Sequence, residues 1–543
     1  MSDASGLSAD EPYVVIVGSG VAGALLADRL SRAGIRVLIL EAGKQITRSE
    51  AVSLYRDSWR RDPQSAYERQ SHASYPDRNA PDRYLSIKGE ATYWCDYLRL
   101  VGGTTWHWGG TTPRFLPMDF ELRSRYGVGR DWPLTYSEIE PYYLQAEQEL
   151  GVSGDSIDDH GSPRSGPYPM PATPMLYSDQ VIARYLKQHN IRVKVLPAAR
   201  NSHIYRGRPA CCGNNSCIPI CPSGAKYSAN IHINNAIQHG AHLIDNSVAY
   251  AVHVNSSGQV ESINYKSPDG QSHTIKGRYY VLACNAIETP KLLLISRSEN
   301  TPDGVANYSG LVGRCLMDHP TVAKAFLMSE PIYTGRGPQV VSALDHGRDG
   351  AFRSQHAAGQ CILSMFAPDI QSYVTSLIEE EKDWESIDNR LEYFATHHGH
   401  ISVLLEQLPD TENRIKPSNS EFDAIGIAKP EIYMKLDSYL VNAADYFNNF
   451  LNEIIGFLMA NKISDFEFGN LWASHPMGTT CMGDNSKMSI VDRNCRSHDH
   501  PNLFIAGSSV FPTGGTANPT LTIAALSLRL ADYMKSVIQT ENL

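Results

Sequence analysis

The sequence predicts a mixed α/β fold that contains a Rossmann-like parallel sheet, and two segments indicate it. Residues 13–17 are a short apolar, β-branched run that turns at once into a glycine-rich stretch. A helical pattern then leads to a second apolar run at residues 35–40, which completes a βαβ unit. Residues 279–283 resemble another buried strand, and an apolar helix follows them.

The turn inside the βαβ unit has the spacing expected for dinucleotide binding. The three glycines Gly18, Gly20 and Gly23 serve a tight turn, close backbone approach to a pyrophosphate, and close packing of helix on strand. The phosphates would lie at the helix N-terminus. Glu41 follows the second strand, where a carboxylate accepts ribose hydroxyls. This pattern predicts a dinucleotide site, although it does not separate FAD from NAD.

Further along the chain the elements are less regular. A second glycine-rich stretch at residues 102–110 is, at its simplest, a turn flanked by core tryptophans. Residues 249–275 are predicted to be rich in strands, with turns at Ser257-Gly258 and Asp269-Gly270. Residues 320–470 mix strands and helices without a recognisable signature, which suits a substrate-facing domain.

Length and charge exclude several classes of protein. A chain of 543 residues has room for roughly two to four domains. The formal net charge of -10, without a segregated basic run, argues against binding to nucleic acid. No stretch of 18 apolar residues runs uninterrupted, so no membrane span is expected. The polar, acidic start of the chain carries no export signal, so membrane association would come only through a partner.

Four of the ten cysteines, Cys211, Cys212, Cys217 and Cys221, fall within eleven positions. A disulfide is disfavoured because adjacent cysteines make strained partners. A zinc site usually shows two CxxC pairs, and that spacing is absent. The Cys221-Pro222 dipeptide resembles the end of ferredoxin cluster loops and favours an iron–sulfur cluster.

Five motifs in order resemble the glucose-methanol-choline (GMC) family of flavin oxidoreductases. They are VVIVGSGVAGALLADRL, VGGTTWHWGG, YYVLACNAIETPKLLLIS, VGRCLMDHP and the tail from His475 to Tyr533. The resemblance implies FAD as the cofactor. Within the family, the segment CCGNNSCIPICPSGAKYS resembles the catalytic subunits of bacterial FAD-dependent glucose dehydrogenase and fructose dehydrogenase.

The resemblance also implies an interleaved domain organisation. An FAD-binding Rossmann-like domain alternates with an α+β substrate domain built on an antiparallel sheet, and a Cys-rich iron–sulfur loop is added to them. The expected FAD-binding parts are 11–130, 231–320 and 473–540, the last with the catalytic residues. A connecting, substrate-side segment is expected at 131–196, the iron–sulfur loop at 197–230, and the substrate domain at 321–472.

Oxidation of an alcohol removes a proton from oxygen and a hydride from carbon, and the flavin N5 accepts the hydride. By the resemblance, His475 is the general base and Asn518 orients the substrate hydroxyl. Asn518 is also expected to cap a helix whose first residue is Pro519 and whose positive end faces the flavin. The remaining cofactor contacts are expected at Gly102, Gly103, Thr104, His107, Gly507 and Pro519.

Two histidines have further expected roles. His107 lies where related pyranose oxidases attach FAD covalently, and covalent attachment and an ordinary contact are equal alternatives here. His319 is a family marker for which a structural role is expected.

The resemblance implies a [3Fe-4S] cluster held by Cys211, Cys217 and Cys221, with Cys212 as the spare and least certain cysteine. Electrons would then leave through the cluster to a multihaem cytochrome c subunit at the membrane. A small chaperone-like subunit would carry the export signal. These expectations place the protein on the periplasmic side of the bacterial inner membrane, with the cytoplasm as the alternative.

Several functions remain open at this stage. A sugar or polyol dehydrogenase is favoured, but the residues around His475 resemble other branches of the family and leave the substrate undecided. A GMC-type alcohol or sugar oxidase and a glycoside 3-dehydrogenase are the enzyme alternatives. A redox-sensing, electron-transferring flavoprotein that turns over no alcohol is the alternative from another class.

Overall fold

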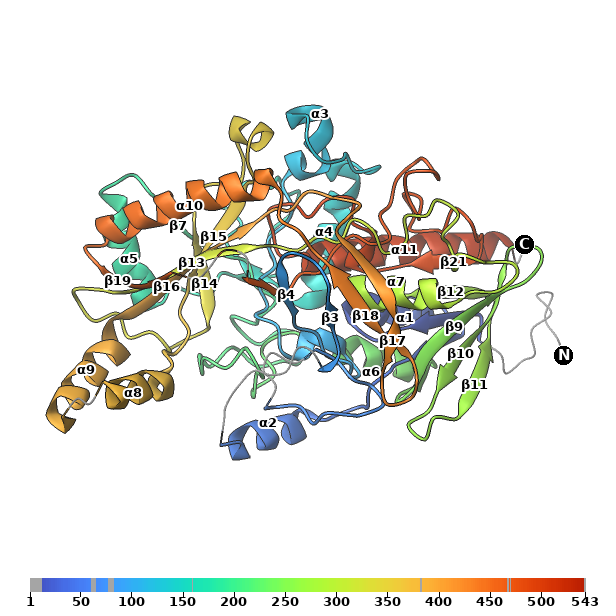
Figure 1. Ribbon diagram of the computed structural model, residues 1–543, viewed down its shortest axis with the longest axis horizontal. Coiled ribbons are helices and arrows are strands. Elements are labelled where there is room, and N and C mark those ends of the chain that lie inside the picture. Colours follow the sequence, from blue (N-terminus) through green and yellow to red (C-terminus); the bar gives the residue numbers. More distant parts are fainter. Residues whose placement is uncertain are drawn as a thin grey trace.

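The computed structural model describes residues 12–59, 65–76, 83–158, 160–380, 383–465, 468 and 470–541. Its two main sheets lie at opposite ends of the long axis, with the parallel sheet near the chain termini in Figure 1. None of the helices in the described ranges is both long and apolar enough to cross a membrane.

The parallel sheet has the strand order β21-β12-β1-β2-β8. Its strands are short and apolar, and four of them are fully buried, as expected for strands covered on both faces. The strands are β1 (Val14–Val17), β2 (Val37–Leu40), β8 (His242–Ile244), β12 (Tyr279–Leu282) and β21 (Leu503–Ile505). The predicted βαβ unit and the predicted strand at 279–283 are therefore confirmed.

Helices from distant parts of the chain pack together beside this sheet. Helix α1 contacts both α6 and α11, and α11 also contacts α4 (Figure 1). These helices are α1 (Val21–Arg32), α4 (Tyr136–Leu150), α6 (Asn230–Gln238) and α11 (Thr520–Glu541), and α7 (Asn285–Ile295) follows β12. Because α1 and α11 come from opposite ends of the sequence, the C-terminal segment completes the N-terminal domain.

The second main sheet has six strands, in the order β19-β13-β16-β15-β14-β7, and all its pairings are antiparallel. The strands are β7 (Val193–Val195), β13 (Thr321–Leu327), β14 (Val340–Leu344), β15 (Gly359–Ser364), β16 (His398–Leu405) and β19 (Asn461–Asp465). The predicted α/β class, with a Rossmann-like domain and an antiparallel-sheet domain, is confirmed. The exact segment boundaries stay a prediction.

The two faces of the antiparallel sheet have different surroundings, because successive side chains along each strand point to opposite faces. Val322, Leu363 and Val403 pack with helix α10 (Ser438–Phe457) in an apolar cluster. Thr321 and Leu404, the next residues along their strands, line a cavity on the other face. This period of two places one face of the sheet in the core and the other over the site.

Smaller elements complete the fold. A three-stranded sheet is formed by β9 (Val248–Val254), β10 (Val260–Lys266) and β11 (Ser272–Lys276), which confirms the predicted strand-rich stretch. A second comprises β17 (Arg414–Phe422), β18 (Ala428–Tyr433) and β3 (Ser86–Ile87). Two strand pairs are β4 (Thr92–Cys95) with β20 (Asn470–Ala473), and β5 (Ser153–Gly154) with β6 (Met170–Pro171).

The remaining helices lie at the periphery of these sheets. They are α2 (Arg48–Asp57), α3 (Leu122–Tyr126), α5 (Tyr177–Lys187), α8 (Ile370–Glu379) and α9 (Trp384–His397). Single turns of 3-10 helix in the described ranges include η2 (Gly103–Trp106), η3 (Pro117–Phe120), η4 (Ala351–Ser354) and η5 (Ser508–Val510). Helices α8 and α9 contact each other and project from the antiparallel-sheet end (Figure 1).

Candidate active site

The first glycine loop forms a backbone cradle at the N-terminus of α1. Gly18 has a φ of +100°, and a Cβ there would lie 2.6 Å from the Ala283 carbonyl oxygen. A Cβ on Gly23 would lie 2.0 Å from the Gly18 carbonyl oxygen, so only glycine permits this packing. A Cβ on Gly20 would meet no atom within 4 Å. The open space beside Gly20 at a helix N-terminus suits an anionic phosphate.

Glu41 lies where the second strand of the βαβ unit ends. Its carboxylate accepts hydrogen bonds from the Ser19 amide (3.0 Å), the Ser19 hydroxyl (2.6 Å) and the Gly43 amide (3.1 Å). Burial raises the pKa of Glu41, and the Ser19 hydroxyl opposes that effect. Glu41 lines a cavity of about 120 Å³ together with the glycine cradle. Its predicted contact with ribose fits this position and stays a prediction.

The second glycine stretch packs directly on the first. The Gly102 amide donates to the Ser19 hydroxyl oxygen at 3.1 Å. A Cβ on Gly103 would lie 3.1 Å from the Gly20 Cα, so the two loops are in close backbone contact. Thr104 lines both the small cavity beside Glu41 and a larger one. The stretch is therefore part of the cradle as well as a turn between core tryptophans.

The larger cavity, here called the central cavity, has a volume of about 410 Å³. It continues from the cradle, since Gly20 and Thr104 line both cavities. The predicted residues His107, Gly507 and Pro519 also line it. The structure thus brings all of the predicted cofactor and catalytic residues, except the cysteines, to these two connected cavities: Gly18, Gly20, Glu41, Gly103, Thr104, His107, His475, Gly507, Asn518 and Pro519 line them, with Gly23 and Gly102 packed behind.

His475 and Asn518 meet at the wall of the central cavity. The Asn518 Nδ2 lies 3.2 Å from the His475 Nε2. The other ring nitrogen, His475 Nδ1, lies 3.0 Å from the Nδ1 of His319. The His319 Nε2 in turn lies 3.1 Å from the Gly515 carbonyl oxygen. His319, for which a structural role was expected, therefore contacts the candidate base directly.

Asp318 holds the backbone of both histidines. Its Oδ1 accepts the His319 amide at 2.7 Å and the His475 amide at 3.1 Å. Its Oδ2 accepts the Tyr93 hydroxyl at 2.9 Å. Sequence reasoning missed Asp318 and Tyr93. The only available signal was the position of Asp318 beside His319 in the Asp-His-Pro motif.

Burial decides the ionisation of this group of side chains. Loss of solvent, with a smaller contribution from the neighbouring His319, lowers the pKa of His475 to about 3. Burial likewise lowers the pKa of His319 to about 4. Burial raises the pKa of Asp318 to about 6, against the amide and hydroxyl donors that stabilise its charge. Both histidines are therefore neutral near pH 7, and His475 has a lone pair available as a base.

Helix α11 begins one residue later than predicted. The prediction made Asn518 the capping residue and Pro519 the first helical residue, but the helix starts at Thr520. The Pro519 carbonyl accepts the Ile523 amide at 2.9 Å. The side chain of Asn518 contacts His475 through Nδ2.

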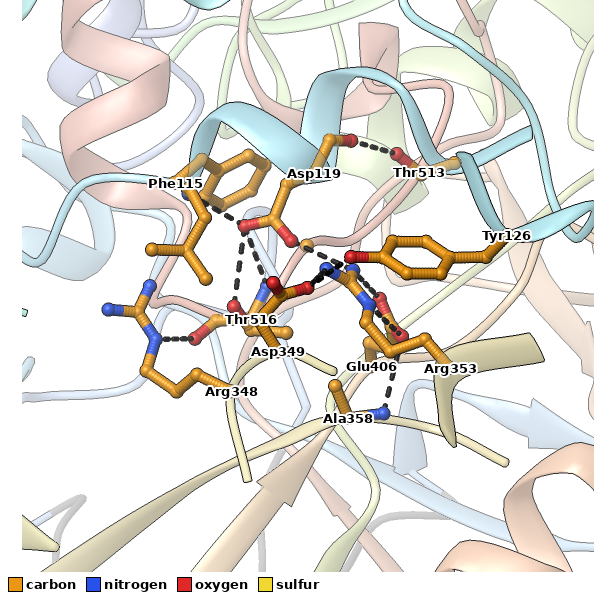
Figure 2. Close-up of polar contacts among 12 residues, drawn as sticks. Phe115, Asp119, Tyr126, Arg348, Asp349, Arg353, Ala358, Glu406, Thr513 and Thr516 are labelled. Atoms are coloured by element: carbon orange, nitrogen blue, oxygen red, sulfur yellow. Dashed lines mark hydrogen bonds and ion pairs between the residues drawn. The ribbon is translucent and has the colours of Figure 1, made fainter. Parts of the chain in front are cut away.

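Thr516, the residue after Gly515, is held by a cluster of buried charged side chains (Figure 2). Arg353 donates to Asp119 at 2.8 Å and to Glu406 at 2.6 Å and 3.0 Å, and all three side chains are buried. Asp119 Oδ2 accepts from the Thr516 hydroxyl at 3.3 Å, and Arg348 donates to the Thr516 carbonyl oxygen at 3.2 Å. These contacts fix the residue that follows Gly515.

The clustered cysteines differ in their burial. Cys217 and Cys221 are buried, Cys211 is half-buried and Cys212 is exposed. Burial raises the pKa of Cys211, and the nearby Cys217 and Cys221 contribute to that rise. No three His, Cys, Asp or Glu side chains converge as ligands of a single metal ion in the described part of the chain. Iron–sulfur binding stays a prediction.

Three cationic side chains surround the cysteines. Arg48 donates to the Cys221 carbonyl oxygen at 2.7 Å, and an Arg200 nitrogen lies 3.9 Å from the Cys217 sulfur. The ammonium of Lys226 is buried and donates to the carbonyl oxygens of Cys217 (2.7 Å), Trp106 (2.9 Å) and Trp108 (2.6 Å). Lys226 thus ties the cysteine loop to the stretch that places His107 on the central cavity.

Comparisons with known proteins agree with this arrangement. Models of the GMC oxidoreductase family match residues 173–321 and 461–527, and a model of NAD(P)-binding Rossmann-like domains matches residues 16–58. The large subunit of fructose dehydrogenase from Gluconobacter japonicus is 38% identical over 543 residues, which covers 97% of each chain. This chain belongs to the GMC oxidoreductase family.

One further relative and one solved structure are also similar to this chain. The 6'''-hydroxyparomomycin C oxidase of Streptomyces lividus is 30% identical over 96% of this chain and 91% of its own. The structure of formate oxidase from Aspergillus oryzae RIB40 superposes with a TM-score of 0.63 at 16% identity, covering 99% of this chain and 100% of the other. The latter likeness shows the fold. The chain is accordingly a flavoprotein oxidoreductase that acts on CH–OH groups, with FAD as its cofactor.

The residues of this chain fit FAD. A Cβ on Gly20 or on Gly507 would meet no atom within 4 Å, so both glycines leave room on the cavity side. The Asn518 Oδ1 is buried and has no hydrogen-bond partner among the described residues. Such a group fits a site that is completed by a ligand.

Proposed function

We propose that this chain oxidises a hydroxyl group of a sugar or polyol, with His475 as the general base and Asn518 as the residue that orients the substrate oxygen. The observation that carries this proposal is the contact between His475 Nε2 and Asn518 Nδ2 on the central cavity, beside the glycine cradle. Bound FAD would supply the acceptor for the hydride that leaves the substrate carbon.

His475 and Asn518 can both hydrogen-bond to one substrate hydroxyl, each in a different role. A hydroxyl placed between them would donate its proton to His475 Nε2 and accept a hydrogen bond from Asn518 Nδ2. The neutral state of His475 allows it to take that proton as the carbon is oxidised. The N-terminus of α11 borders the same cavity through Thr520, and its positive end would stabilise negative charge there.

A polyhydroxylated substrate suits the lining of the central cavity. Thr111, Thr321 and Ser364 contribute hydroxyl groups that could bind further substrate oxygens. The 38% identity to a fructose dehydrogenase subunit favours a hexose over a simple alcohol. The glycoside 3-dehydrogenase alternative uses the same base and the same lining.

An oxidase is the second candidate function. The similarity to 6'''-hydroxyparomomycin C oxidase, at 30% identity, favours it. A [3Fe-4S] cluster held by Cys211, Cys217 and Cys221 would favour the dehydrogenase, since a cluster passes on electrons one at a time. Three thiols with cationic neighbours Arg200 and Lys226 suit an anionic cluster.

Cys212 is exposed and Cys211 is half-buried, and this exposure of the cysteine loop supports electron transfer to a redox partner. We therefore assign electron transfer to a multihaem cytochrome c subunit and export to a small chaperone-like subunit, on the periplasmic side of the inner membrane. The name of the fructose dehydrogenase large subunit supports a complex of several subunits.

One experiment tests substrate and cluster together. The purified protein is mixed without oxygen with a panel of sugars and polyols, and flavin reduction is followed by absorbance. Iron content and the EPR spectrum are recorded for the wild type and for Cys211→Ser, Cys217→Ser, Cys221→Ser and, as the matched control, Cys212→Ser. We expect reduction by at least one sugar, and an iron signal lost in the first three variants and kept in Cys212→Ser.

Other outcomes would contradict parts of the proposed function. If no member of the panel reduces the flavin, the sugar assignment fails. An iron-free wild type with rapid peroxide production in air identifies the oxidase instead. Loss of the signal only in Cys212→Ser would contradict the proposed ligand set.

Covalent attachment of FAD through His107 is tested separately. If the bond exists, flavin stays with the denatured wild-type chain and is released from denatured His107→Ala.

A further inference from the structure

We propose that His319 is a positioning residue that fixes the tautomer of His475, so that the Nε2 of His475 keeps its lone pair for the substrate. The inference rests on the proposed function, because it concerns how the same base is prepared. The geometry that carries it is a chain of hydrogen bonds from the Gly515 carbonyl through His319 to His475.

The first hydrogen bond of the chain involves a carbonyl oxygen, which can only accept a hydrogen. The Gly515 carbonyl oxygen lies 3.1 Å from the His319 Nε2, so this nitrogen must carry a hydrogen. His319 is buried, and burial lowers its pKa to about 4. A neutral imidazole that is protonated at Nε2 has a bare Nδ1. His319 therefore presents an acceptor, not a donor, to its neighbour.

The second step determines which ring nitrogen of His475 carries the hydrogen. The Nδ1 atoms of His319 and His475 are 3.0 Å apart, and the two rings are nearly perpendicular, at 78°. Because His319 Nδ1 accepts, His475 Nδ1 must donate. The neutral His475 ring then has no hydrogen on Nε2. Asn518 Nδ2, 3.2 Å from that Nε2, is a donor and completes the chain with consistent polarity.

The carbonyl that starts the chain is held in place by its own loop. Gly515 has a φ of +61°, and a Cβ there would lie 2.8 Å from the Phe115 ring. Thr516 is fixed by Asp119 and Arg348, as Figure 2 shows. Asp119 is in turn fixed by Arg353. The antiparallel-sheet domain thereby determines where the acceptor for His319 lies.

Proton uptake leaves this chain intact. When His475 Nε2 takes the substrate proton, its Nδ1 hydrogen still donates to His319 Nδ1. Without His319, the Nδ1 and Nε2 tautomers of His475 would compete, and the Nε2 tautomer would present a hydrogen where the base must act. An incorrect tautomer of a catalytic histidine is a recognised cause of large losses in rate.

Two substitutions of His319 separate the acceptor from the bulk of the ring. His319→Leu removes the acceptor, whereas His319→Asn keeps one, because Asn Oδ1 and His Nδ1 both branch from Cγ. The FAD-loaded proteins are mixed without oxygen with the sugar that reduces the wild-type flavin fastest. We expect the limiting rate of flavin reduction to fall about 100-fold or more in His319→Leu, within the usual range for general-base catalysis. His319→Asn should recover most of it, with the apparent substrate Kd within about threefold of the wild type in both.

Equal rates in His319→Leu and the wild type would overturn the inference. So would an equally slow His319→Asn, because the ring would then matter for packing alone. If the wild-type flavin is not reduced by any sugar, the proposed function fails instead, and the two failures are distinct.

A second measurement needs neither turnover nor a stable variant at position 319. Solid-state NMR of ¹⁵N-histidine-labelled protein, with His475→Gln to assign the signals, reports which nitrogen of His475 carries hydrogen at pH 7. The inference requires a protonated Nδ1 and a bare Nε2. The reverse assignment would overturn it.

Discussion

The glycine cradle and the histidine site border the same pair of cavities, but they are assembled differently. Most of the cradle comes from one βαβ unit, in which Gly23 packs on the Gly18 carbonyl five residues earlier, although Gly18 also packs on Ala283 and Gly103 on Gly20. The histidine site joins Asp318 and His319, His475, and the loop from Gly515 to Asn518, which lie far apart in the sequence. The cradle therefore depends largely on local backbone shape, and the histidine site depends on tertiary hydrogen bonds between segments that are distant in the sequence.

The largest effect should come from adding one carbon atom to the cradle. In Gly23→Ala the new Cβ would lie 2.0 Å from the Gly18 carbonyl oxygen, so helix and strand must separate. We expect the purified variant to lose its bound flavin, as measured by absorbance, while circular dichroism reports whether the fold is kept. Gly456→Ala, in an exposed turn of α10 where the new Cβ meets no atom within 4 Å, is the matched control and should keep full flavin content. Normal flavin in Gly23→Ala would contradict the steric account of the cradle.

The buried ion pairs of Arg353 should show the next largest effect. Arg353→Met leaves Asp119 and Glu406 buried without their shared cation. Removal of one partner of a buried ion pair costs about 3–5 kcal/mol, so the free energy of unfolding in urea should fall by that amount. Arg184→Met breaks only the exposed pair with Glu330 and should cost less than about 1 kcal/mol. If the free energy of unfolding falls by similar amounts in the two variants, the buried ion pairs of Arg353 do not stabilise the protein more than an exposed pair does.

A smaller effect should appear in the pH dependence of flavin reduction. Because burial raises the pKa of Asp318 to about 6, its carboxylate is ionised above that pH and gains a proton below it. The protonated form is a weaker acceptor for the amides of His319 and His475. At one unit below the pKa about a tenth of a carboxylate is ionised, so the rate at pH 5 should be about tenfold lower than at pH 8.

The neighbouring groups titrate outside this range. The pKa values of His475 and His319 are lowered to about 3 and about 4, and that of Tyr93 is raised well above 10. Asp318→Asn should be slow at every pH and should lack the step near pH 6. A wild-type profile that is flat to pH 5, or a step that survives in Asp318→Asn, would contradict this role of Asp318.

The sequence predicts most of the cradle, because its determinants are local. The spacing of Gly18, Gly20 and Gly23 between two apolar runs leads directly to strand, turn and helix, and the structure agrees. His475 and Asn518 were found through the flanking family motifs. Their contact, at 3.2 Å, had no signal in either segment alone.

What the sequence could not predict is the coupling between segments. His319 and His475 are separated by 156 positions, and their contact depends on how two distant segments of the chain pack together. The clamp formed by Arg353, Asp119 and Glu406 has no motif, because a buried charge is indistinguishable from a surface charge in a single sequence. The α11 boundary was wrong by one residue, because the first helical hydrogen bond is accepted by the Pro519 carbonyl, so the helix starts at Thr520.

The most direct test of the account is anaerobic, rapid-mixing reduction of the flavin in the wild type and in His475→Ala, with the best sugar of the panel. We expect His475→Ala to keep its FAD and its visible spectrum but to be reduced about 10²- to 10⁴-fold more slowly. A His475→Ala protein that is reduced within a few-fold of the wild-type rate would contradict the assignment of His475 as the base.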